Sequence, residues 1–345
     1  MSARNKSPHR VWAVILLLCF AVAIPVVSRY SCRQEGPDHG PTPALTKVIL
    51  AQNPVPHSAL PIIAKHNGYF RQEGLDVEVK EFATGKLCFD AMVGGSADFS
   101  TVAETPIMYA GFGQLQVVVV ASIESSDLSV KVLARKDKGV NRPGDLQGKL
   151  IGTFKGGSAE YFLAQFLRKH GLTMKDVKVT YMQPPELVTA VIRGDLAAIA
   201  MWEPHIYNAQ KAIGDQAVVF TGEDLYTETF HIAVTQDYAN RNGLVVERFL
   251  RALAKAEEFL KANPERAKQI LLAAIPIDAE ILNHIWPDFR FDLILEKSTI
   301  DLLEKEAEFA KQTGAVPPDS STPDYRKMFA PRFLERVKVN GVKFE

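Results

Sequence analysis

The sequence predicts an α/β protein made of two lobes, and three observations lead to that prediction. Its 345 residues are about twice the length of a typical domain. Short apolar strands alternate with amphipathic helices from residue 45 onward, the pattern of helices packed on a largely parallel sheet. Residues 91–110 and 190–209 also align without gaps, so that Gly95 falls on Gly194 and Glu104 on Glu203. Two facing lobes that contain the same strand–helix unit explain this repeat.

The N-terminus predicts export. Three basic residues precede an apolar run that begins at residue 11, and this combination indicates a signal sequence. We assign residues 1–31 to a signal peptide or an N-terminal anchor, and residues 32–44, rich in Pro and Gly, to a linker. Anchoring through the retained apolar segment or through a lipidated Cys32 stays open. Cys88 is the one cysteine after the linker, so we expect a buried apolar side chain there and no internal disulfide.

The secondary structure follows from local patterns. Strands are expected where short apolar runs lie between turn residues: 47–51, 76–82, 97–101, 117–122, 130–135, 150–153, 177–181, 197–201, 217–221 and 229–235. Helices are expected between them, each closed by a glycine: 58–67, 86–93, 158–170 and 186–193. The rest of the chain is almost wholly helical: 245–262, 265–274, 278–285 and 297–313.

An ordered series of stretches resembles a known family. HNGYFRQEGLDVEV, FATGKLCFDAMVGGSADFS and GDLAAIAMWEP are similar to segments of the nitrate/sulfonate/taurine-type periplasmic binding proteins, which share their fold with thiamine-pyrimidine precursor binders. The resemblance implies a type II periplasmic-binding-protein fold, in which each lobe is a mixed sheet flanked by helices and two crossover strands join the lobes. Lobe one would be 45–130 plus 235–345, and lobe two 131–234. The loop at 52–58 contains two prolines where many members have a glycine, so the ligand cannot be transferred from the family.

The resemblance also implies a function. The chain would be an exported solute-binding protein, in the periplasm or on the cell surface, that captures a small organic ligand and delivers it to the permease of an ABC importer. We expect a monomer without catalytic residues, metal or cofactor. The formal net charge of zero gives no reason to expect nucleic acid, and no P-loop motif is present. Two alternatives stay open: an enzyme of the same fold acting on a pyrimidine or menaquinone precursor, and a membrane-tethered ligand sensor.

Candidate ligand-binding residues lie in the loops where helices begin. In open parallel sheets, ligands bind beyond the carboxyl ends of the strands, where helix N-termini offer free N–H groups. Five such loops supply the candidates: Asn53, His57 and Ser58; Thr84 and Gly85; Glu104 and Thr105; Gly157 and Ser158; Trp202 and Glu203. Each type of residue has a structural alternative. A serine can cap a helix, a glutamate can act as a favourable charge at a helix start, and a tryptophan can pack in the core.

The charge of these candidates suggests the kind of ligand. If Glu104 and Glu203 point into the cleft, they would accept hydrogen bonds from nitrogen groups, while Gly85 and Ser158 would donate to an anionic group. A simple inorganic anion would be repelled by two carboxylates in a dry cleft. The sequence therefore favours an aminosulfonate or a pyrimidine over nitrate, provided that both glutamates point inward.

Overall fold

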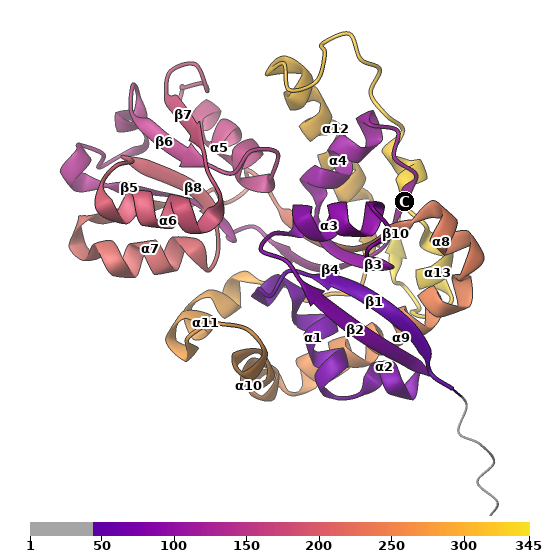
Figure 1. Ribbon diagram of the computed structural model, residues 1–345. Helices are drawn as coiled ribbons and strands as arrows, with labels where there is room; N and C mark the ends of the chain where they lie inside the picture. The colour runs from indigo at the N-terminus through magenta and orange to yellow at the C-terminus, as the bar shows by residue number, and fades with distance from the viewer. Residues whose placement is uncertain (1–43) are drawn as a thin grey trace, which may run out of the picture. The chain divides into compact units, whose positions relative to one another are not determined.

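The computed structural model describes residues 44–345, whose main strands form two five-stranded sheets (Figure 1). The strand order is β2-β1-β3-β10-β4 in the first sheet and β7-β6-β8-β5-β9 in the second. The predicted signal peptide or anchor, the linker up to residue 43 and Cys32 lie outside the described residues. Within the described part, none of the helices is both long enough and apolar enough to cross a membrane.

The first sheet is mixed. Its strands are β1 (Thr46–Gln52), β2 (Leu75–Glu81), β3 (Phe99–Ala103), β4 (Val117–Ser126) and β10 (Glu228–Thr235). Strand β1 runs parallel to β2 and β3, whereas β10 runs antiparallel to β3 and β4. The helices of the N-terminal part of this lobe are α1 (Ala59–His66), α2 (Tyr69–Gln72), α3 (Gly85–Val93) and α4 (Glu104–Phe112).

The second sheet repeats this topology. Its strands are β5 (Val130–Arg135), β6 (Leu150–Thr153), β7 (Lys178–Tyr181), β8 (Ala198–Trp202) and β9 (Ala217–Phe220). Strand β6 runs parallel to β7 and β8, and β5 runs antiparallel to β8 and β9. Helices α5 (Ser158–Lys169), α6 (Pro184–Arg193) and α7 (His205–Ile213) pack on it. The predicted fold class, two mixed sheets flanked by helices, is confirmed.

The sequence repeat corresponds to equivalent positions in the two sheets. Gly95 and Gly194 both have a positive φ, at 76° and 79°, a backbone conformation that glycine adopts without strain. The next strand is β3 in the first lobe and β8 in the second. Each of these strands is followed by one of the repeated glutamates, Glu104 and Glu203.

The two hydrophobic cores and the strand pairing show which residues belong to each lobe and which segments connect the lobes. The core of the second lobe contains buried residues from Val130 to Tyr226 only. Residues 228–234, expected in the second lobe, belong to the first sheet, because β10 finds backbone partners on both edges in β3 and β4. The connections between the sheets are therefore the short segments 127–129 and 221–227, rather than the strands themselves.

The C-terminal region is mostly helical and covers the first lobe. It contains α8 (Gln236–Arg241), α9 (Gly243–Ala262), α10 (Pro264–Ala274), α11 (Ala279–Ile285), α12 (Lys297–Gln312), α13 (Pro331–Glu335) and a two-stranded sheet of β11 (Leu295–Glu296) and β12 (Val342–Lys343). Phe249 of α9 stacks on Phe99 with ring centroids 4.1 Å apart. Phe309 of α12 reaches the second lobe, where its ring meets that of Tyr161 edge to face with centroids 5.5 Å apart.

The stack of Phe249 on Phe99 makes a testable contribution to stability. Because Phe249 is fully buried, Phe249→Ala should lower the free energy of unfolding by about 3–5 kcal/mol. Leu244 is the second residue of the same helix but is 70% exposed, and Leu244→Ala should change the free energy of unfolding by less than about 0.5 kcal/mol. Urea unfolding of both variants checks this, and equal effects would contradict the assignment of α9 to the core.

Candidate functional site

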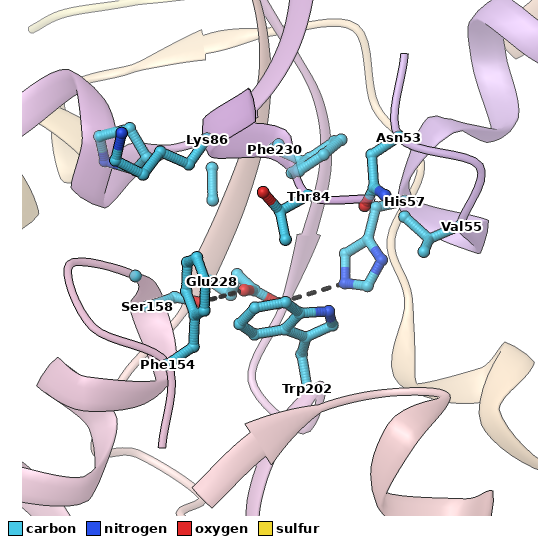
Figure 2. A pocket seen from close by; sticks show the side chains of 14 residues that line it. Asn53, Val55, His57, Thr84, Lys86, Phe154, Ser158, Trp202, Glu228 and Phe230 are labelled. Atoms are coloured by element: carbon cyan, nitrogen blue, oxygen red, sulfur yellow. Dashed lines mark hydrogen bonds and ion pairs between the residues drawn. The ribbon is translucent and has the colours of Figure 1, made fainter. Parts of the chain in front are cut away.

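A cavity of about 40 Å³ is lined by residues of both lobes (Figure 2). The predicted residues that line it are Asn53, His57, Thr84, Gly85, Gly157, Ser158 and Trp202. Four of the predicted residues do not line it: Ser58, Glu104, Thr105 and Glu203. Residues that the sequence did not single out as ligand contacts, Phe154, Glu228 and Phe230, complete much of the wall.

The N-termini of α3 and α5 both reach the cavity. Thr84 caps α3 by accepting a hydrogen bond from the Leu87 amide at 3.2 Å. A Cβ atom at Gly85 would lie 3.3 Å from Phe230, and one at Gly157 would lie 2.8 Å from Phe154, so small residues let these helices begin against the aromatic wall. Because the first N–H groups of a helix lack partners within it, both helix starts present donors and partial positive charge.

Three aromatic rings form much of the apolar surface of the cavity. Phe154 and Trp202 meet edge to face with centroids 5.8 Å apart. Phe230 lies against the His57 ring with centroids 5.4 Å apart. Trp202 is thus a cavity wall and not a fully buried core residue.

The carboxylate of Glu228 joins the two lobes at the cavity. Ser158 Oγ donates to Glu228 Oε1 at 2.6 Å, and His57 Nε2 lies 3.2 Å from Oε2 (Figure 2). Burial raises the pKa of Glu228, but hydrogen bonds from His57, Ser158 and Ser129 hold this pKa below 4.5. The cavity wall therefore contains an ionised carboxylate, although Glu228 is only 3% exposed.

Glu228 is not among the predicted site residues because the local sequence pattern places the start of the last strand at Thr229. Strand β10 begins one residue earlier, so that Glu228 pairs with Ser126 inside the sheet. An acidic residue at the first position of a strand without other Asp, Glu, Lys or Arg residues is the signal that could have identified it.

The polar residues around His57 do not form a catalytic triad. Ser129 Oγ lies 2.9 Å from His57 Nε2, the same nitrogen that faces Glu228, and His57 Nδ1 is buried without a partner. A Ser-His-acid triad requires the histidine to contact the serine and the acid through different nitrogens. Among residues 44–345, no group of three His, Cys, Asp or Glu side chains could hold a metal ion.

Glu104 faces the second connecting segment instead of the ligand cavity. Its Oε2 accepts a hydrogen bond from the Thr229 amide at 2.9 Å, and its Oε1 accepts one from the Tyr226 hydroxyl. Burial, followed by the charge of Glu228, raises the pKa of Glu104 to about 7. The carboxylate thus holds the chain where it returns from the second lobe to β10, in contrast to the expected contact with ligand.

Glu203 has the equivalent position at the first connecting segment. Its Oε1 accepts from Lys131 Nζ at 2.9 Å and its Oε2 from the Tyr207 amide at 3.0 Å. The Glu203 amide also donates to the Ser129 carbonyl at 3.0 Å. Glu203 is not among the residues that line the cavity, and its carboxylate holds the connecting segment, in contrast to the ligand contact expected from the sequence.

The two remaining candidates also have protein partners. Ser58 Oγ donates to the Asn53 carbonyl at 2.8 Å and so closes the loop after β1. The Thr105 hydroxyl donates to Glu306 Oε1 at 2.6 Å. Cys88 is fully buried, as expected, and burial raises the pKa of its thiol to about 12.

Comparison with known proteins identifies relatives over most of the chain. The family described as "NMT1/THI5 like" matches residues 55–267. A putative binding protein of Brucella abortus (strain 2308) is 27% identical over 224 residues, which are 64% of this chain and 69% of that protein. A putative aliphatic sulfonates-binding protein of Bacillus subtilis (strain 168) is 26% identical over 265 residues, 74% of this chain and 78% of that protein.

The fold is also similar to solved structures. The alkanesulfonate-binding protein SsuA from Xanthomonas axonopodis pv. citri, bound to MOPS, has a TM-score of 0.71 and 20% identity. The match covers 84% of this chain and 100% of that one. At this identity, the similarity supports the two-lobed architecture.

The pKa of Glu104 predicts a pH dependence of stability. Because its pKa is about 7 in the folded chain and 4.5 as a free side chain, the folded state binds more protons between these values. Glu104 should therefore contribute a fall of about 2–3 kcal/mol to the free energy of unfolding as the pH rises from 5 to 8, whereas the buried His231 and His205, whose pKa values are lowered, contribute with the opposite sign.

The variant Glu104→Gln cannot titrate, so the change in its free energy of unfolding from pH 5 to pH 8, measured with urea, should be more positive than the change in the wild type by about 2–3 kcal/mol. Glu304→Gln, at an exposed position of α12, serves as the matched control and should keep the wild-type profile. A Glu104→Gln profile parallel to that of the wild type would refute the assignment.

Proposed function

Because the chain belongs to the NMT1/THI5-like family, we propose that it is a solute-binding protein that delivers its ligand to the permease of an ABC importer. The proposed ligand is a small organic molecule, an aminosulfonate, a sulfonate or a pyrimidine-like compound. The observation that carries the proposal is the cavity between the lobes, where two helix N-termini, three aromatic rings and a carboxylate converge. The relative from Bacillus subtilis, named for aliphatic sulfonates, supports this class of ligand.

The small cavity indicates that the lobes must move during binding. Its volume of about 40 Å³ is far below the roughly 300–1,000 Å³ of ordinary ligand pockets. Polar contacts hold the lobes together around it: Ser158 with Glu228 at 2.6 Å, Lys131 with Asp288 at 2.8 Å, and Lys211 with Glu280 at 2.6 Å. A ligand would enter after these contacts open about segments 127–129 and 221–227, and closure around it is the form we expect the permease to recognise.

We further propose that the protein acts outside the cytoplasmic membrane as a monomer and performs no chemistry on its ligand. The basic and apolar N-terminal sequence supports export. The sharing of His57 Nε2 by Ser129 and Glu228 argues against a hydrolase-type site. The intact mass of the exported protein distinguishes a cleaved signal from a retained or lipidated anchor.

Ligand binding can be followed through Trp202. A library of small sulfonates, amines and pyrimidines should contain members that raise the melting temperature and change the tryptophan fluorescence with saturation, because Trp202 lines the cavity. In Trp202→Phe the fluorescence change should be lost, while the thermal shift persists in weaker form because an aromatic wall remains. A library without a single stabilising member would contradict the proposed function.

A further inference from the structure

We infer that the ligand carries a positively charged nitrogen group and that Glu228 is the residue that selects it. This inference rests on the proposed solute-binding function and adds the charge of the substrate. Glu228 takes the place of Glu104 and Glu203, which the sequence suggested as acceptors for a nitrogen group of the ligand. Those two glutamates have protein partners and do not line the cavity.

The Glu228 carboxylate can accept a further hydrogen bond from a ligand. A carboxylate offers about four acceptor positions, and Ser158 and His57 fill one on each oxygen. The Ser129 hydroxyl, 2.9 Å from His57 Nε2, supplies a third hydrogen bond to this carboxylate, which leaves about one acceptor position free. A nitrogen group of the ligand can therefore complete the set of donors around this carboxylate without displacing Ser158.

The one basic side chain of the cavity lining beside Glu228 is His57, whose Nε2 lies 3.2 Å from Oε2 and forms an ion pair with it when the imidazole is protonated. Lys86 is the only lysine or arginine among the cavity-lining residues, and its ammonium pairs with Asp90 at 2.6 Å. Figure 2 shows the Lys86 side chain extending away from Glu228. His57 faces only Oε2 of this buried carboxylate, so a cationic group of the ligand beside Oε1 gains a hydrogen bond and adds charge compensation.

The aromatic rings that line the cavity also favour a cationic group. Phe154, Trp202 and Phe230 line the cavity together with Glu228, and the faces of aromatic rings attract cations within about 6 Å. A carboxylate surrounded by such rings is suited to an ammonium or amidinium group. A lone anion, in contrast, would meet the charge of the buried Glu228 carboxylate at short range.

The other end of the ligand would face the helix starts. The N-termini of α3 and α5 at Gly85 and Gly157 present N–H donors and partial positive charge. A sulfonate, carbonyl or ring nitrogen of the ligand fits these donors. The ligand class is therefore a small molecule with a cationic nitrogen at one end and a hydrogen-bond acceptor at the other.

Two matched pairs of probes test this inference by isothermal titration of the full protein at pH 7. Taurine and 2-hydroxyethanesulfonate differ only in an ammonium or a hydroxyl group, and so do 5-(aminomethyl)pyrimidine and 5-(hydroxymethyl)pyrimidine. In at least one pair, the amino compound should bind at least tenfold more tightly. In Glu228→Gln, which keeps an acceptor for Ser158, this preference should fall at least tenfold.

Glu124→Gln is the matched control. Glu124 is also fully buried in the first sheet but does not line the cavity, so its variant should keep the preference. The absence of a preference for the amino compound in both pairs, an unchanged preference in Glu228→Gln, or no binding of any probe would overturn the inference. Binding of other library members would then leave the proposed solute-binding function standing, whereas a library without ligands would contradict both.

Discussion

The contact between Ser158 and Glu228 is the interaction on which the arrangement of the cavity depends. It joins the first residue of α5 in the second lobe to the first residue of β10 in the first lobe. An ionised, buried carboxylate requires donors, and these come from the helix start, from the connecting segment and from the loop after β1. The same group therefore holds the lobes together and gives the cavity its negative charge.

The repeated glutamates have a structural role at the two connections. Glu104 holds the returning segment through Tyr226 and Thr229, and Glu203 holds the outgoing segment through Lys131 and the Ser129 carbonyl. Each lobe thus supplies one buried carboxylate that fixes the chain at a crossing point. Movement of the lobes would occur between these fixed points.

Much of the fold could be predicted from the sequence because it depends on local patterns. Strands β5 and β6 have the expected limits, and α12 ends one residue before the expected limit, since apolar spacing and turn residues define such elements. The cavity-lining helix starts at Gly85 and Ser158 followed from the same patterns. The directions of Glu104 and Glu203 could not be predicted, because their partners Tyr226 and Lys131 are distant in sequence and become neighbours only in the folded protein.

The ionisation of Glu228 in the closed protein is the most direct measure of this account. Its carboxyl carbon can be followed by NMR during a pH titration, with Glu228→Gln used to assign the resonance. The account predicts that Glu228 titrates below 4.5, because donors from both lobes stabilise the charged form. Titration near or above neutral pH would show a protonated group, and would contradict a negatively charged cavity that joins the two lobes.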